Sequence, residues 1–242
     1  FSAFPPLVLF AIASAACVVA ILLFMLTRVP ERPLMQKKKE TISLIHHFFE
    51  EGTAVPGVIS FLFGFVYASV NTYLPLMAEE AHIAYAGLFF VFGTLFVFIS
   101  RLFGGKLYDR HGPFCVMFPG VLIYSVAIFM ICTAHSSVYL LCGSIFYGLG
   151  AGLLMPAIMT WLFNVVAPAR RSNASATYYN TMDLGTCLGI VLLGTLAGHV
   201  GYIAIFYAVL AVMGLYIAFT LWAWKSGHMS DHRTPPSGSP VP

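Results

Sequence analysis

The sequence predicts an all-α transmembrane protein with seven membrane-spanning helices. Hydrophobic residues make up 60% of the 242-residue chain and charged residues only 9%, whereas a soluble domain carries about a quarter charged residues. The apolar residues also gather into seven runs, each close to the roughly 20 residues that a bilayer crossing requires. Because lipid cannot satisfy exposed backbone groups, each run must be a helix.

The seven runs can be placed in order along the chain, with boundaries good to a few residues. The fourth and fifth are divided only by the polar turn Ala134-His-Ser-Ser137, since no Asp, Glu, Lys or Arg occurs between His111 and Ala169. The predicted spans are Phe4–Leu26, Pro56–Met77, Ala84–Phe103, Pro113–Ala134, Val138–Val166, Asn173–Ala197 and Gly201–Trp224.

The charges predict how these spans are oriented. When the spans alternate in direction, all 12 Lys and Arg residues fall on one side of the membrane. Cationic connections stay in the cytoplasm during insertion, so we expect a multi-pass protein of the plasma (inner) membrane with a cytoplasmic C-terminus. The net charge of +3 therefore reflects topology, and it gives no reason to expect a nucleic-acid partner. The connections on the opposite side carry Glu79, Glu80, His82, His135 and His199.

The connections divide the chain into four expected regions. Residues 1-28 hold the first span, and residues 29-55 form a linker that is basic at first and then amphipathic over Ile42–Glu51, a pattern typical of a helix lying on the membrane surface. Residues 56-225 hold six spans with short connections. Residues 226-242, rich in Pro, Ser and Gly, are expected to be a disordered cytoplasmic tail.

Several classes of chemistry find no support in the sequence. The five cysteines lie in or beside spans without metal-ligand spacing, so we expect no metal site and no disulfide framework. No arrangement of nucleophile and base, paired carboxylates or phosphate-binding loop is present, and we expect neither an enzyme nor a cofactor. The chain starts at Phe1 without an initiator Met, which suggests a truncated sequence.

The segment Arg101–Gly112 is the most specific motif. Gly105 stands four residues before Asp109-Arg110, and Gly112 follows two residues later. This spacing resembles the cytoplasmic loop signature of the major facilitator superfamily. Together with Gly87-Leu-Phe-Phe90, Arg170-Arg-Ser-Asn-Ala and Met182-Asp-Leu-Gly185, it resembles the second half of bacterial exporters of drugs and small metabolites.

This resemblance implies an architecture and an activity. The single first span, the long linker and the six later spans would be helix six, the central loop and helices seven to twelve of a two-bundle transporter. Such a protein works by alternating access, usually driven by proton antiport. The implied partners are the lipid bilayer, a small-molecule substrate, protons, and an N-terminal half of the same polypeptide that this sequence lacks.

The resemblance also implies roles for the motif. As a gating loop it would latch the two halves together through Arg101, Gly105, Asp109, Arg110 and Gly112. Asp109 could face the positive N-terminal end of a neighbouring helix. The alternative is an ordinary positively charged turn whose sequence matters little.

Asp183 is the only acidic residue well inside a span. It lies 12 residues after Arg171, about 18 Å along a helix and so near the bilayer midplane. Ionisable groups at that depth are costly and usually functional, which makes Asp183 a candidate for proton coupling. The alternative is a structural carboxylate that stabilises helix packing.

The remaining candidates line or shape the cavity that the resemblance implies. Small residues allow close helix packing, and a proline inside a helix permits a kink. The candidates for substrate contact are Asn71, Tyr73, Tyr147 and Asn180, and the candidates for packing or hinge motion are Gly148, Gly152, Pro156, Gly185 and Gly189. Asn71 and Tyr73 could instead be interfacial residues.

Two other classes of membrane protein fit part of the sequence. A seven-helix receptor would share the span count and the Asp109-Arg110-His111 triplet after the third span, and a six-helix channel subunit is the other alternative. The first cytoplasmic connection is too long for a receptor, and no re-entrant segment typical of a channel filter is visible.

Overall fold

The computed structural model describes residues 6–26 and 52–229, which belong to two compact units. In the first unit, helix α1 (Pro6–Leu26) is apolar apart from Ser14. The predicted linker helix over Ile42–Glu51 and the predicted disordered tail beyond Met229 lie outside the described residues.

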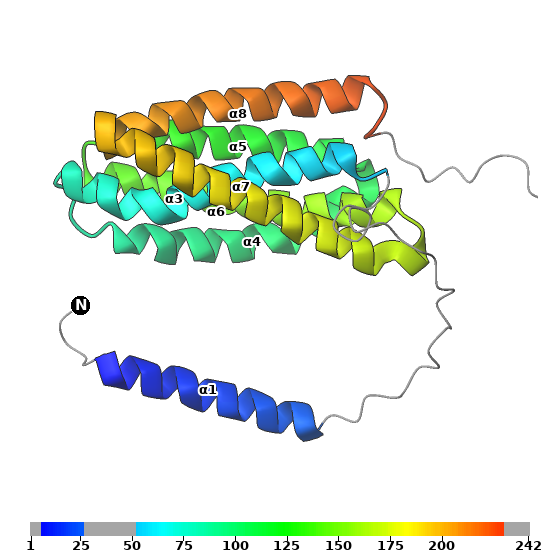
Figure 1. Ribbon diagram of the computed structural model, residues 1–242, viewed down its shortest axis with the longest axis horizontal. Coiled ribbons are helices and arrows are strands. Elements are labelled where there is room, and N and C mark those ends of the chain that lie inside the picture. The colour runs from blue at the N-terminus through cyan, green and yellow to red at the C-terminus, as the bar shows by residue number, and fades with distance from the viewer. Residues whose placement is uncertain (1–5, 27–51, 230–242) are drawn as a thin grey trace, which may run out of the picture. The chain divides into compact units, whose positions relative to one another are not determined.

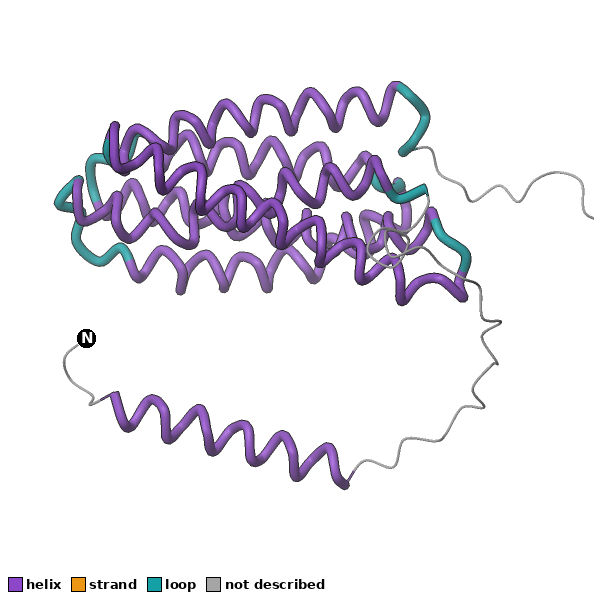
Figure 2. Tube along the Cα trace, in the orientation of Figure 1, coloured by secondary structure: helices purple, strands orange, loops and turns teal. Residues whose placement is uncertain are grey.

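The second unit is a bundle of antiparallel helices (Figures 1 and 2). Its members are α3 (Ala54–Glu80), α4 (Gly87–His111), α5 (Phe114–Cys132), α6 (Ser137–Val165), the short 3₁₀ helix η1 (Pro168–Arg170), α7 (Arg171–Val200) and α8 (Tyr202–Lys225). The six long helices are apolar and long enough to cross a membrane. The prediction of an all-α transmembrane fold is confirmed for the described residues, where no strand occurs.

The prediction was wrong about where α4 ends. The expected span stops at Phe103, and the residues from there to Gly112 were expected to form a loop. In the structure α4 continues to His111, because Gly104 fits closely against Leu153 of α6 and long basic side chains can extend from the last turns of α4 towards water. The turn itself is only Gly112 and Pro113. Gly112 has φ +80° and ψ 179°, a conformation essentially restricted to glycine.

The bundle is organised around two tightly packed helix pairs. Helix α6 packs on α4 and on α5, while α3 packs on α7 and on α8, and α5 and α8 join these two groups. The most extensive contacts are those of α4 with α6 and of α3 with α7. Contacts of α6 with α3 and α7 are fewer, so a seam runs between the two pairs.

Glycines bring α4 and α6 into backbone contact. A Cβ atom on Gly148 would overlap the carbonyl oxygen of Gly93, and one on Gly152 would overlap Ser100 Oγ and lie 2.7 Å from Val97 O. This is the small-residue packing typical of membrane helix pairs. The hinge role expected for Gly152 and Pro156 stays a prediction.

The α3–α7 pair is built in the same way. Cβ atoms on Gly185 and Gly189 would meet the carbonyl oxygens of Phe61 and Phe65 on α3. Side chains add to the pair, because Ser60 Oγ donates a hydrogen bond to Tyr178 O (3.1 Å). Close backbone approach therefore fixes the register of both pairs.

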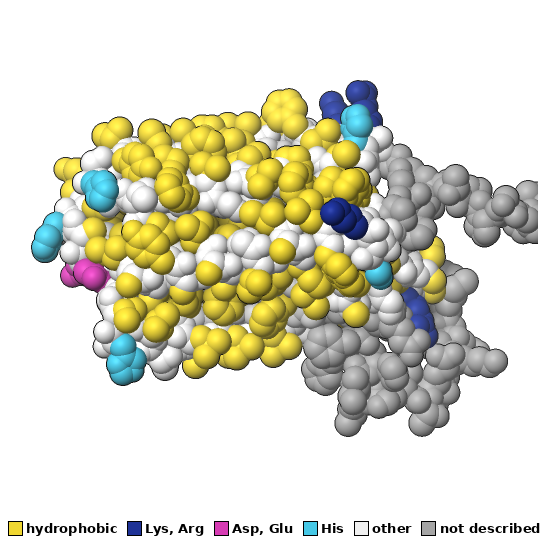
Figure 3. All heavy atoms as spheres, turned by 90° about the horizontal axis from the view of Figure 1, so that it is seen from above, with side chains coloured by type: hydrophobic (Ala, Val, Ile, Leu, Met, Phe, Trp, Pro, Cys, Tyr) yellow, Lys and Arg dark blue, Asp and Glu magenta, His cyan; other side chains and the backbone are white. Residues whose placement is uncertain are grey.

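Charged side chains mark the two ends of the bundle (Figure 3). We call the end that carries Lys106, Arg110, Arg170, Arg171 and Lys225 the basic end, and the end that carries Glu79 and Glu80 the acidic end. At the acidic end, Glu80 Oε2 accepts a hydrogen bond from Tyr202 N (2.6 Å) and so caps the start of α8. On the face that Figure 3 shows, hydrophobic side chains cover much of the surface between the two ends, as a membrane-embedded protein requires.

Candidate functional site

One polar surface crosses the seam between the two helix pairs. We call it the central polar face and define it by Tyr67 and Asn71 on α3, Arg101 on α4, Tyr147 and Met155 on α6, and Tyr178 on α7. The contacts described below join them in two groups, Arg101 with Met155 and Asn71 with Tyr67 and Tyr147. Tyr178 interacts electrostatically with Arg101 of the first group and with Tyr67 of the second. They come from four helices, so the face exists only in the folded bundle.

Arg101 is the cation of this face. It lies ten residues before His111 at the end of α4, which is about 15 Å from the basic end. Its guanidinium Nη2 is 3.9 Å from Met155 Sδ on α6 and interacts electrostatically with the Tyr178 hydroxyl on α7. An arginine at this depth is costly unless it faces protein or a water-filled cavity, and here it is exposed on the surface of the bundle.

Asn71 and Tyr147 connect the two helix pairs. Asn71 Nδ2 donates a hydrogen bond to the Tyr147 hydroxyl (2.9 Å), and the rings of Tyr67 and Tyr147 stack with centroids 6.3 Å apart and an interplanar angle of 13°. Asn71 is exposed, whereas Tyr147 is buried. The buried tyrosine therefore anchors an exposed amide at the seam.

Tyr124 on α5 lies behind this contact. Its ring is 5.4 Å from that of Tyr147 and 6.0 Å from that of Phe63, and its side chain is fully buried. Its hydroxyl has no hydrogen-bond partner among the described residues. The interior of the bundle near Tyr147 is thus aromatic.

The structure separates the predicted cavity residues. Asn71 and Tyr147 come together, but Tyr73 is only 6% exposed, and its hydroxyl donates to Ile190 O on α7. Tyr73 therefore holds the α3–α7 pair together in this structure and is not part of the central polar face. Asn180 is half-buried on α7.

Asp183 is exposed on α7 and forms no hydrogen bond or ion pair with any other described residue. It is two residues before Gly185, and this spacing turns its side chain about 200° away from the glycine face that packs on α3. The structure does not link Asp183 to Arg101 by any polar contact in the described part of the chain. Its role in proton coupling stays a prediction.

The Arg101–Gly112 motif divides into two parts. Asp109 and Arg110 are exposed in the last turn of α4 at the basic end, whereas Arg101 lies about two turns deeper. A Cβ atom on Gly105 would meet nothing within 4 Å, whereas one on Gly104 would be 3.0 Å from Leu153 Cδ2. Within this bundle only Gly104 is needed for packing, and the latch role of the motif stays a prediction.

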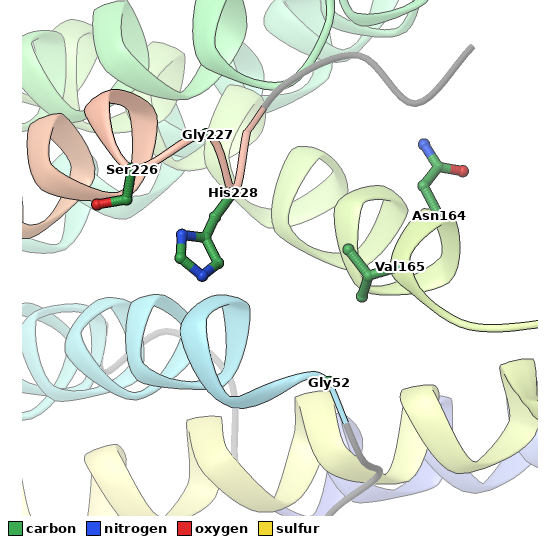
Figure 4. Close-up of a pocket in the computed structure, with 6 residues that line it drawn as sticks. All are labelled: Gly52, Asn164, Val165, Ser226, Gly227 and His228. Carbon is green, nitrogen blue, oxygen red and sulfur yellow. The ribbon is translucent and has the colours of Figure 1, made fainter. Parts of the chain in front are cut away.

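A cavity opens at the basic end (Figure 4). It has a volume of about 560 Å³ and is lined by residues that end α6, follow α8 and precede α3: Gly52, Asn164, Val165, Ser226, Gly227 and His228. No Lys or Arg is among these described lining residues. This cavity lacks the fixed charge that the central polar face has.

Sequence reasoning placed Arg101 in the gating-loop motif at the end of the Ala84–Phe103 span and so missed its depth, because it did not expect the helix to continue to His111. The signal was present in the spacing of eight residues between Arg101 and Asp109, which corresponds to about 12 Å of helix. Tyr67, Met155 and Tyr178 carried no comparable signal, since single tyrosines and methionines are common in apolar spans.

Comparison with known proteins places the chain in a family. The family model described as Major Facilitator Superfamily matches residues 1–142 and 57–241. The chain is 30% identical over 151 residues to "Probable anion transporter 3, chloroplastic" of Arabidopsis thaliana, which covers 61% of this chain and 28% of that protein. It is 26% identical over 102 residues to "Proton-coupled antiporter flippase LtaA" of Staphylococcus saprophyticus, covering 41% and 26% of the two chains.

Solved structures show the same fold. A crystal structure of the peptide transporter POT in complex with sulfate superposes with a TM-score of 0.60 at 19% identity, and it covers 81% of this chain and 40% of that protein. The chain spans less than a third of the length of the curated relatives that it matches. The family match decides against the receptor and channel alternatives, and the chain belongs to the major facilitator superfamily.

Proposed function

We propose that this chain forms the C-terminal half of a secondary transporter that moves a small anionic solute by alternating access. The observation that carries the proposal is Arg101, a fixed cation held about 15 Å from the basic end of α4 on the central polar face. A permanent positive charge at membrane depth attracts an anion and repels a cation, because the low dielectric of the surroundings strengthens both interactions.

The names of the relatives support an anionic solute. Several matched chloroplast proteins are described as probable anion transporters, and one is described as a sodium-dependent phosphate transport protein. These names narrow the expected solutes from drugs and small metabolites in general to those that carry a negative charge. The direction of transport stays a prediction.

Proton coupling is the second part of the proposal. Asp183 is a carboxylate at membrane depth with no cationic partner among the described residues, and one relative is described as a proton-coupled antiporter. A carboxylate can drive transport only if its affinity for a proton differs between the two conformations of the transporter. Asp183 is exposed on this half, so contacts with an opposing half could supply that difference.

The proposal is tested by measuring flux in proteoliposomes that contain the intact transporter. A pH gradient should drive saturable movement of an organic anion such as 6-hydroxyhexanoate, and neutral or cationic compounds of the same size should not compete. Asp183→Asn should abolish this gradient-driven flux and leave anion exchange at equal pH largely intact, because exchange needs no net proton movement.

The control is Glu79→Gln, which removes an exposed carboxylate at the acidic end of α3. It should leave gradient-driven flux close to the wild-type value. Gradient-driven flux that survives in Asp183→Asn would exclude the coupling role, and competition by cations but not by anions would contradict the proposed substrate class.

A further inference from the structure

The amide of Asn71 has a fixed orientation. Its Nδ2 atom donates to two acceptors, Tyr67 O at 2.7 Å and the Tyr147 hydroxyl at 2.9 Å. A backbone carbonyl can only accept a hydrogen bond, so the nitrogen of the amide must be the atom that faces Tyr67 O. Both amide hydrogens are then used, and Oδ1 is turned away from these partners.

Asn71 Oδ1 is therefore an acceptor without a partner among the described residues. The side chain is exposed, nine residues before the acidic end of α3 at Glu80 and so about 14 Å inside that end. An amide oxygen that faced lipid at this depth would carry the full penalty of an unmade hydrogen bond. Its contact with Tyr147 instead places it at the seam between the two helix pairs.

We infer that Asn71 is a specificity-determining residue, which accepts a hydrogen bond from an O–H or N–H group of the transported anion. Tyr147 is a positioning residue for it, because its hydroxyl holds one of the two amide hydrogens. A site that offers an acceptor discriminates strongly against an analogue without the donor, since that acceptor is then left unpaired. This inference rests on the proposed function and narrows the solute to an anion with a separate donor group.

The spacing of the two contacts gives the approximate length of the solute. Met155, which contacts Arg101, and Tyr147, which contacts Asn71, are eight residues apart on α6, or about 12 Å along the helix. Inorganic phosphate is too small to reach both groups, so the solute is an organic anion with several bonds between its charge and its donor.

The test compares two probes that differ by one hydroxyl group, 6-hydroxyhexanoate and hexanoate, whose binding to the purified intact transporter is measured by calorimetry. The wild type should bind 6-hydroxyhexanoate more tightly. Asn71→Leu should weaken 6-hydroxyhexanoate binding about 3- to 10-fold, the range for one hydrogen bond, and should not weaken hexanoate binding, because hexanoate has no donor to lose. Tyr147→Phe keeps the ring and removes the hydroxyl that holds the Asn71 amide. It should weaken only the binding of 6-hydroxyhexanoate, by a smaller factor than Asn71→Leu.

Two further variants separate the possible failures. Ser125→Ala removes a hydroxyl on α5 whose one hydrogen bond within the described part of the chain is to Val121 O of the same helix, and this variant should change neither affinity. Arg101→Gln should weaken the binding of both probes. If it weakens the binding of neither probe, the proposed anion site is wrong. If Arg101→Gln weakens the binding of both probes, but Asn71→Leu changes the two affinities equally or changes neither, only the role of Asn71 is wrong. Failure of the wild type to prefer 6-hydroxyhexanoate, or to bind either probe, would also overturn the inference.

Discussion

Replacing Arg101 by glutamine should reduce anion transport by the intact protein about 10- to 100-fold. Arg101 is exposed on the central polar face with its guanidinium Nη2 3.9 Å from Met155 Sδ, where it can meet a negatively charged group directly. A hydrogen bond to a charged group contributes about 1.5–3 kcal/mol, and glutamine keeps the polar character but removes the charge. Initial rates of anion uptake into proteoliposomes measure the effect.

Lys106→Gln is the matched control. Lys106 is on the same helix, five residues closer to the basic end, and is exposed there. An exposed cation near the water interface is screened by salt, so this variant should transport at nearly the wild-type rate. Equal losses in the two variants would mean that the general positive charge of α4 matters and that Arg101 has no specific role.

Replacing Gly152 by valine should destabilise the bundle by about 3 kcal/mol or more, at the upper end of the range for overpacking. The new Cβ would overlap Ser100 Oγ and lie 2.7 Å from Val97 O on α4. Neither of these can move far, because a backbone carbonyl and a short side chain have little freedom. We expect α4 and α6 to separate locally, and thermal unfolding of the purified transporter to shift by roughly 10 °C.

Gly214→Ala provides the contrast for this substitution. Gly214 is in the interior of α8, and a Cβ atom there would meet nothing within 4 Å. Alanine should therefore stabilise α8 slightly, because glycine costs roughly 0.5–1 kcal/mol in a helix interior. If Gly152→Val and Gly214→Ala had similar melting temperatures, the close packing of α4 on α6 would not contribute to stability.

The span pattern could be predicted because it depends on local properties of the sequence. Each long helix of the bundle is close to a predicted apolar run, and the turn at Ala134–Ser137 divides α5 from α6 as expected. The extension of α4 beyond Phe103 could not be predicted in this way. Charged and glycine residues there lower the hydropathy, whereas the continuation of the helix depends on packing of Gly104 against Leu153 of α6.

The candidate site was less predictable because it is made by contacts between distant helices. Asn71 and Tyr147 could each be selected as polar residues within spans, but their hydrogen bond joins residues 76 positions apart. The same limit applies to Tyr73, whose hydroxyl bonds to Ile190 O, 117 positions away. Hydropathy and spacing along one helix do not contain this information.

The central claim is that the surface around Arg101 is open to water and binds anions, and cysteine labelling at Met155 tests it most directly. In an intact transporter whose native cysteines, among them the five of this sequence, are replaced by serine, Met155→Cys should react faster with an anionic methanethiosulfonate reagent than with a cationic one of similar size. An excess of the transported anion should protect it.

Leu122→Cys is the control. Leu122 is exposed on the apolar helix α5, which does not contribute to the central polar face. A thiol at this position should therefore react slowly with both reagents. The result that supports the account is rapid, anion-selective and anion-protected labelling at Met155→Cys alone. Labelling as slow as that of Leu122→Cys, or faster reaction with the cationic reagent, would contradict it.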